Sequence, residues 1–247
     1  MESRLQLDIN AQPDNTTCGP TCLQAVYRYY GDEMPLPQLI SEIPSLPQGG
    51  TLAVLLGCHA LQRGYRATIF TYNLQVFDPT WFRPDSPPLA DRIRKQMAVK
   101  DKVRLQISSR AYLEFLRLGG DVRMEDMTGN LLRRYLKRSI PILTGLSATY
   151  LYNERREFGD RSAPDDVRGL PQGHFVVLGG YDAVERTVLV ADPLESNPLA
   201  PGANEYEVDL DRLMCAIMLG IVTYDANLLI IRPKEGRGSP LTTDTPA

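Results

Sequence analysis

The chain has 247 residues, which is the length of one large domain or of one domain with an insertion. Its composition, 43% hydrophobic and 23% charged, is that of a globular protein and excludes disorder over the whole chain. The net charge is -3, and no basic patch with interleaved aromatic side chains is visible. We therefore expect no nucleic-acid partner.

Signals for export and for membrane insertion are missing. Residues 1–10 carry charges and no apolar run of the kind found in secretory signals. The longest uncharged stretch, residues 43–62, is interrupted by prolines and glycines, so we predict no membrane span. We expect a cytoplasmic protein, in which the four cysteines stay thiols: Cys18, Cys22, Cys58 and Cys215.

The first third of the chain is rich in helix signals. Capping residues followed by Gly19 and Pro20 precede apolar side chains at three- and four-residue spacing, which predicts a helix from Cys18 to near Gly31. The same pattern predicts a helix over 52–63, and the run 67–72 predicts a strand. After it, a proline-rich segment and the charged stretch 91–104 indicate an insertion or loop around 76–110, with a solvated helix after the linker.

Strand signals follow in the second half. Helices are still predicted at 111–118, 128–138 and 210–218, but the apolar runs at 140–147, 175–181, 187–191 and 228–231 predict strands. Helices first and strands second predict an α+β fold with a helical N-terminal lobe and an antiparallel C-terminal sheet around one site. We expect one domain over 1–233 and a disordered tail over 234–247.

Cys18 has the setting of a reactive thiol. It lies at the first turn of a predicted helix, where the helix dipole and unpaired backbone N–H groups favour the thiolate. Gly19 would leave room there for the backbone of a substrate. The other three cysteines, Cys22, Cys58 and Cys215, are interpreted as small buried apolar residues.

A cysteine nucleophile needs a base, and the chain has only two histidines, His59 and His174. His59 falls in an amphipathic helix, where a core or partly exposed histidine is the default interpretation. His174 opens an apolar strand after a glycine- and proline-containing loop, where a side chain can face a cleft. His174 is therefore the candidate base.

Asp192 is the candidate partner of His174. If residues 183–185 form a three-residue hairpin loop, Asp182 opposes Arg186, and continuing that register places Asp192 diagonally beside His174 on one face. A carboxylate there would fix the imidazole tautomer. A slip of one residue would send the two side chains to opposite faces.

Gln12 lies six residues before Cys18, in the segment that leads to the helix. Its side-chain N–H, together with the backbone N–H of Cys18, would form an oxyanion hole. The alternative is that Gln12 is an ordinary exposed loop residue.

These segments resemble the bacteriocin-processing, double-glycine-leader cysteine peptidases of the papain-like superfamily. The resemblance is carried by QPDNTTCGPTC (12–22), GHFVVLGGYD (173–182) and VADP (190–193). It implies a stand-alone cysteine peptidase with a papain-like two-lobed fold, no metal or other cofactor, and a peptide substrate. It also implies roles for four residues: Cys18 as nucleophile, His174 as base and acid, Asp192 as its orienting partner and Gln12 as oxyanion donor.

The chain departs from that family in two respects. It has no membrane span and no phosphate-binding glycine loop of the transporters that carry such peptidases, and the region 76–110 has no assignable counterpart. Its substrate and oligomeric state therefore stay open. Three other functions also stay open: a phytochelatin-synthase-like acyltransferase, an inactive peptide-binding domain, and a zinc-binding module that uses Cys18, Cys22, Cys58 and His59.

Overall fold

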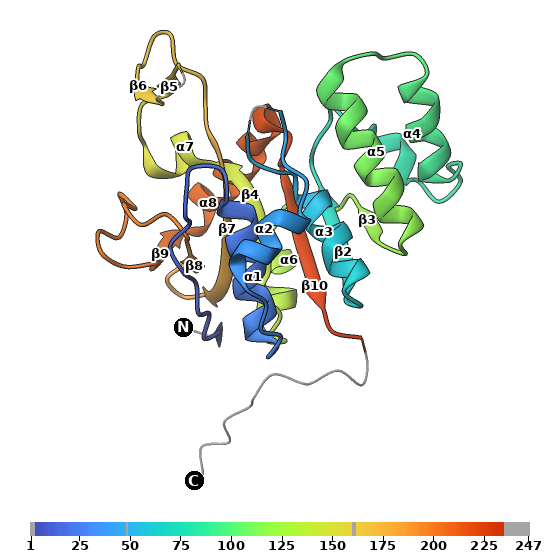
Figure 1. Cartoon of the computed structure of the whole chain (residues 1–247). Helices are drawn as coiled ribbons and strands as arrows, with labels where there is room; N and C mark the ends of the chain where they lie inside the picture. Colours follow the sequence, from blue (N-terminus) through green and yellow to red (C-terminus); the bar gives the residue numbers. More distant parts are fainter. Residues whose placement is uncertain (1–2, 48, 160–161, 235–247) are drawn as a thin grey trace.

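The computed structural model describes residues 3–47, 49–159 and 162–234. Within these residues the strands form an eight-stranded sheet ordered β3-β2-β10-β4-β7-β8-β9, with β1 beside β7, and a separate hairpin of β5 and β6 (Figure 1). The strands are β1 Ser3–Arg4, β2 Arg66–Thr71, β3 Asp121–Arg123, β4 Ile142–Ser147, β5 Glu157–Phe158, β6 Ala163–Pro164, β7 Gly173–Asp182, β8 Thr187–Ala191, β9 Glu205–Asp209 and β10 Asn227–Arg232.

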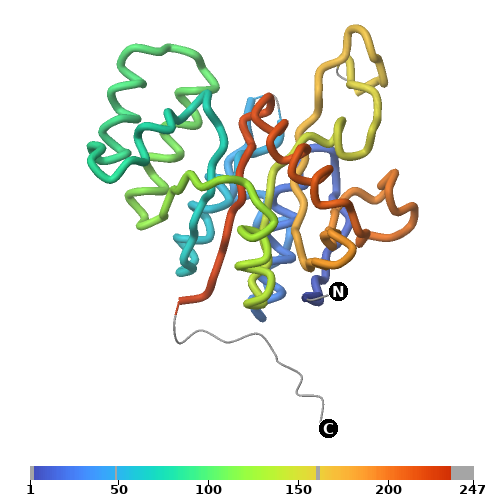
Figure 2. The backbone as a smooth tube through the Cα atoms, turned by 180° about the vertical axis from the view of Figure 1, so that it is seen from behind, coloured from blue at the N-terminus to red at the C-terminus, as the bar shows by residue number. Residues whose placement is uncertain are grey.

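Helices cover both faces of the sheet. α1 and α3 pack on one face, against β7 and β2, and α6 and α8 pack on the other, as the view from behind makes plain (Figure 2). The helices are α1 Cys18–Tyr29, α2 Leu36–Glu42, α3 Ala53–Gln62, α4 Leu89–Met97, α5 Val103–Arg117, α6 Gly129–Leu136, α7 Ala148–Tyr152 and α8 Leu210–Leu219, with 3-10 turns η1 Pro79–Phe82 and η2 Gly220–Thr223. In the described part of the chain, none of them is both long and apolar enough to cross a bilayer.

This architecture confirms the α+β class with N-terminal helices and a mostly antiparallel sheet. The described exception is the parallel pairing of β2 with β3, which extends the sheet with strands from the first half of the chain. The elements that the sequence did not predict are short or rich in charged residues. α2 buries only Leu39, and β9 alternates buried Tyr206 and Val208 with charged residues.

The region 76–110 folds into η1, α4 and the first half of α5. Asp78 caps η1 by accepting a hydrogen bond from the Thr80 backbone N–H at 2.8 Å, and Ile93 is the buried contact of α4. α5 begins at Val103, eight residues before the predicted start, because its first turns bury Leu105 and Ser108 against the rest of the protein. The domain bounds and the insertion stay predictions, and the predicted tail lies outside the described residues except for Lys234.

The start of α1 and the start of β7 lie side by side. Cys22, one turn into α1, donates a hydrogen bond from its thiol to the Phe175 carbonyl at 3.2 Å. Phe175 and Phe70 belong to the continuous apolar core that runs between the helices and the sheet. This packing brings the first turn of α1 next to His174.

Candidate active site

The chain turns into α1 through a hydrogen-bonded loop. The Asp14 carboxylate accepts hydrogen bonds from the backbone N–H and the hydroxyl of Thr16, both at 2.7 Å. Thr17, the N-cap residue, makes no side-chain capping bond. Cys18 therefore occupies a first turn with unpaired backbone N–H groups, as predicted, whereas the side-chain cap expected from the preceding residues does not form.

Gly19 has a different role from the one expected. A Cβ atom at this position would lie 2.7 Å from a methyl group of Thr51 and 3.3 Å from the Phe175 ring. The space beside Gly19 is thus filled by the protein's own side chains. The glycine allows close packing of α1 against the core and is not an opening for a substrate backbone.

Cys18, His174 and Asp192 lie in series. His174 Nε2 lies 2.8 Å from Asp192 Oδ1, and the Cys18 thiol is close enough to the ring to raise the pKa of His174. Because Nε2 is engaged by Asp192, Nδ1 is the nitrogen left for Cys18. Cys18 and His174 are each 8% exposed, and Asp192 is fully buried.

The hairpin between β7 and β8 corrects the predicted loop. Asp182 pairs with Thr187, not with Arg186, so the loop has four residues and the register near the turn is shifted by one. A β-bulge between Leu178 and Gly180 then removes the shift, and Val177 pairs with Ala191 as predicted. The loop prediction was wrong, but His174 and Asp192 still reach the same face because the bulge compensates.

Asp192 is held by donors that the sequence did not single out. Its Oδ2 accepts hydrogen bonds from Tyr152 at 2.7 Å, Tyr206 at 2.8 Å and Asn197 at 2.9 Å. Its Oδ1 accepts from the Leu194 backbone N–H at 2.9 Å in addition to His174. A buried carboxylate needs such donors, but nothing in the sequence indicates which distant residues supply them.

Charge pairing decides the protonation of His174 and Asp192. Burial alone would lower the pKa of His174, but Asp192 and Cys18 outweigh it and raise the pKa to about 10. For Asp192, burial raises the pKa, while the charge and hydrogen bond of His174 and the hydrogen bond from Tyr152 lower it by more. The folded protein therefore favours an imidazolium beside a carboxylate.

We predict that the stability of this pair depends on pH. An unfolded histidine has a pKa of about 6.5, so the stabilisation from His174 is complete below that pH and is lost as the pH rises toward 10. The difference in free energy of unfolding between wild type and His174→Gln should shrink over this window, by at most about 1.4 kcal/mol per pH unit. Urea denaturation at stepped pH measures it. A difference that grows with pH would mean that burial dominates and that the folded ring is neutral.

Gln12 is fixed beside this series. Its backbone N–H donates to the Pro193 carbonyl at 2.9 Å, which ties the loop to the residue after Asp192. Its side-chain Nε2 donates one hydrogen bond, to the Asp14 carbonyl at 2.8 Å, and so keeps a second N–H. Its Oε1 is buried and has no hydrogen-bond partner among the described residues.

The remaining thiols and His59 have other surroundings. His59 lies between the Tyr27 hydroxyl, 2.8 Å from Nδ1, and Glu42, 3.0 Å from Nε2, which supports its interpretation as a core histidine. Cys58 contacts the Ala111 carbonyl. No group of three or more metal-ligating side chains lies together in the described part of the chain, which leaves the zinc alternative without support. Cys215 was predicted to be buried and is exposed, because it lies on the outer side of α8.

We predict that iodoacetamide at neutral pH modifies Cys18 before Cys22 and Cys58. Burial raises the pKa of Cys58 to about 12 and raises the pKa of Cys22 well above its usual value, whereas Cys18 lies beside the His174 imidazolium. Because Cys215 is exposed, the comparison requires a Cys215→Ser protein, with modification followed by peptide mass mapping. Faster modification of Cys22 or Cys58 would contradict the assignment of the thiol.

The chain belongs to the Peptidase_C39 like family, whose model matches residues 4–208. The matched range includes Gln12, Cys18, His174 and Asp192. A comparison with curated protein sequences gave no match.

A solved structure shows the same fold, and others are similar. The chain is similar to a C39-like peptidase, described as putative, from Bacillus anthracis, with 13% identity and a TM-score of 0.51 over 94% of this chain and 98% of that one. It is also similar to a double glycine motif protease from an AMS/PCAT transporter, solved with its leader peptide (13% identity, TM-score 0.45, 94% and 95% covered). A third match is xylellain, a cysteine protease from Xylella fastidiosa, with 13% identity and a TM-score of 0.45 over 94% of this chain and 85% of that one.

Proposed function

We propose that this protein is a cysteine peptidase that hydrolyses a peptide or amide bond. The observation that carries the proposal is the buried series in which one nitrogen of His174 faces the Cys18 thiol and the other bonds to Asp192. This arrangement is what nucleophilic catalysis by a thiol requires: a nucleophile, a base within hydrogen-bond reach and a third group that orients the base.

The first half of the reaction forms an acyl-enzyme. His174 holds the proton of Cys18, and the thiolate attacks the carbonyl carbon of the substrate. The negative charge on the carbonyl oxygen is stabilised by the backbone N–H of Cys18 and by the second N–H of Gln12. When the C–N bond breaks, the imidazolium gives its proton to the leaving amine and a thioester remains on Cys18.

The second half releases the acyl group. His174, now neutral, takes a proton from water as the water attacks the thioester, and the carboxylic acid leaves while Cys18 regains the proton. An amine in place of water would give acyl transfer by the same steps. The choice between the two acceptors is open, and it is decided by partitioning the acyl-enzyme between water and added amines.

The test is cleavage of a diverse peptide library under reducing conditions, with products identified by mass spectrometry. We expect cleavage by the wild type and none by Cys18→Ala, because no other thiol neighbours His174 in the described part of the chain apart from buried Cys22. Cleavage that persists in Cys18→Ala contradicts the proposal. So does a wild type that is alkylated at Cys18 but cleaves no peptide, which is the behaviour of an inactive binding domain.

Gln12→Ala is predicted to lower kcat by about 10² to 10³ and to leave KM and the alkylation rate of Cys18 nearly unchanged. The reason is that its N–H acts only once negative charge develops on the substrate oxygen. Gln12→Glu should be at least as damaging, since a carboxylate repels that oxygen. Asn15→Ala, a change at an exposed residue of the same loop, is the control. A Gln12→Ala enzyme with wild-type kcat would leave Gln12 as a structural loop residue.

A further inference from the structure

A small arm projects from the molecule directly before His174. We define the arm as residues 154–159 and 162–172; it contains β5 and β6 and connects α7 to β7 (Figure 1). Two hydrogen bonds fix its base: Ala148 N–H to the Gln172 carbonyl, and Gln172 N–H to the Thr149 hydroxyl, both at 2.9 Å. These bonds tie the foot of the arm to the start of α7, and at Gln172 the arm continues along the chain into β7, which carries His174.

The described part of the arm is internally braced. Glu157 and Leu170 exchange two backbone hydrogen bonds, at 3.1 and 2.8 Å. The Asp165 carboxylate accepts from the backbone N–H groups of Val167 at 3.0 Å and Arg168 at 2.8 Å, and from the Arg168 side chain at 2.6 Å. The arm is therefore a preformed element, although a hairpin of this size gains little stability from its own two strands.

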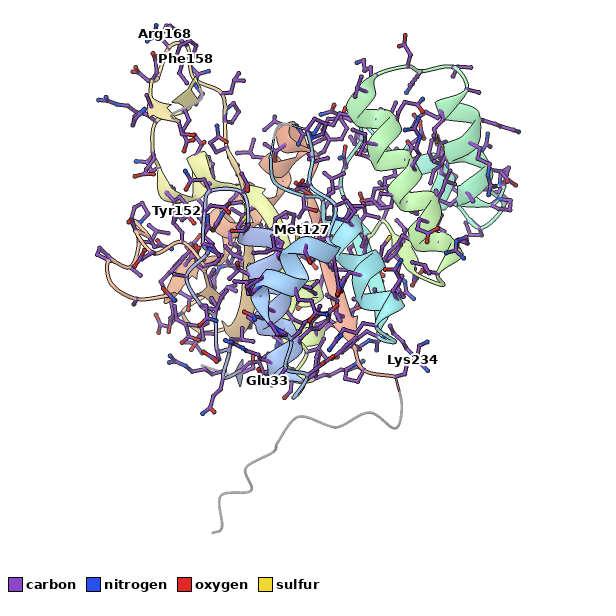
Figure 3. The ribbon with its side chains drawn as sticks, in the orientation of Figure 1. Glu33, Met127, Tyr152, Phe158, Arg168 and Lys234 are labelled. Atoms are coloured by element: carbon purple, nitrogen blue, oxygen red, sulfur yellow. The ribbon has the colours of Figure 1, made fainter. Side chains whose placement is uncertain are left out.

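The arm carries three exposed apolar side chains. Val167 is 80% exposed, Leu170 is 70% exposed and Phe158 is 44% exposed, the last with the Arg168 guanidinium 4.4 Å above its ring. Figure 3 shows Phe158 and Arg168 at the outer end of the arm, far from Tyr152 at the level of α7. Exposed apolar side chains on a braced element are available for contact with a partner.

We propose that the arm is a binding surface for the polypeptide substrate, on which Val167 and Leu170 contact apolar side chains of the segment that flanks the scissile bond. Two observations favour the substrate as the occupant. The arm leads along the chain directly into β7 and His174, and the hydrogen bonds within the arm are already formed. Leu170 is four residues from His174, a span of at most about 14 Å, which an extended peptide of roughly four residues covers. The inference rests on the proposed peptidase function.

The first test measures binding without turnover. In a Cys18→Ala protein, a fluorescent ten-residue peptide is selected from the library by capture on that protein, and its Kd is measured by anisotropy. We expect Val167→Ser/Leu170→Ser to weaken binding at least tenfold, because each buried apolar side chain accounts for about a tenfold change. The matched control is Val184→Ser, which removes a valine that is 85% exposed in the β7–β8 turn.

The second test separates the arm from the catalytic groups. In the active enzyme, the double variant should raise KM for the ten-residue peptide and leave kcat unchanged, and it should not affect a peptide trimmed to two residues on either side of the cleaved bond.

An unchanged Kd, or an equal loss for the trimmed peptide, overturns the proposal. Sedimentation gives another result that would overturn it: the wild type is a dimer, and the double variant dissociates that dimer without changing the peptide Kd. The surface would then bind a second copy of the chain. A wild type that binds the peptide but cleaves nothing contradicts the peptidase function and leaves the binding surface standing.

Discussion

Replacing His174 with alanine is expected to lower kcat/KM for peptide cleavage by about 10⁴ or more. The imidazole is the group that contacts both the Cys18 thiol and Asp192, and without it neither the nucleophile nor the leaving amine has a proton partner. The measurement is the initial rate of cleavage of the best library peptide, with folding checked by circular dichroism.

His59→Gln is the matched control for that experiment. An amide at position 59 can still bond to Tyr27 and Glu42, so this variant should fold and keep kcat/KM within a few-fold of the wild type. An active His174→Ala enzyme beside an inactive, folded His59→Gln enzyme would reverse the assignment of the base.

Asp192→Asn is expected to fold and to lower kcat by about 10³ to 10⁴. Three donors, Tyr152, Tyr206 and Asn197, surround the position of Oδ2, so the oxygen of the introduced amide would settle there and its NH₂ group would face His174. The ring would then accept at Nε2 and carry its proton on Nδ1, which is the wrong tautomer to take the proton of Cys18.

Single removal of a tyrosine hydroxyl provides the control for Asp192→Asn. Burial and the neighbouring Asp192 charge raise the pKa values of Tyr152 and Tyr206, so both stay protonated donors, and Tyr206→Phe leaves the carboxylate its remaining donors. We expect a loss of kcat well below that of Asp192→Asn. An Asp192→Asn enzyme with nearly wild-type kcat would mean that the carboxylate is a structural group and does not orient His174.

Most of the elements around the site were predictable from local pattern. α1, α3, β7 and β8 arise where apolar spacing and capping residues indicated them, because each has a strong period and a clear start or end. α5 was predicted only from Ala111, since its first turns follow a charged stretch without a clear start signal. The sequence did not indicate α2, α7 or β9, which are five to seven residues long and owe their structure to neighbouring elements.

Three expectations failed for reasons that lie in the tertiary structure. Gly19 was expected to leave room for a substrate backbone, but Thr51 and Phe175 fill that space. Cys215 has the sequence surroundings of a buried residue, but burial depends on which side of α8 faces the sheet. The β7–β8 loop is one residue longer than expected, and only the bulge near Gly179 restores the alignment of His174 with Asp192. A β-bulge changes the pairing register of two strands, and the spacing of apolar residues along the sequence does not indicate where one forms.

The sequence by itself determined the chemistry that is available: a cysteine at a helix start, two histidines to choose from, and the aspartate and glutamine that complete the candidate site. Residue type and local period carry this information because capping, dipole and strand alternation act over a few residues. Only the tertiary structure decided which groups meet. Tyr152 and Tyr206 contact Asp192, and Gly19 packs against Thr51 and Phe175; these contacts join segments that lie apart in the chain. Packing over such distances leaves no local signal in the sequence.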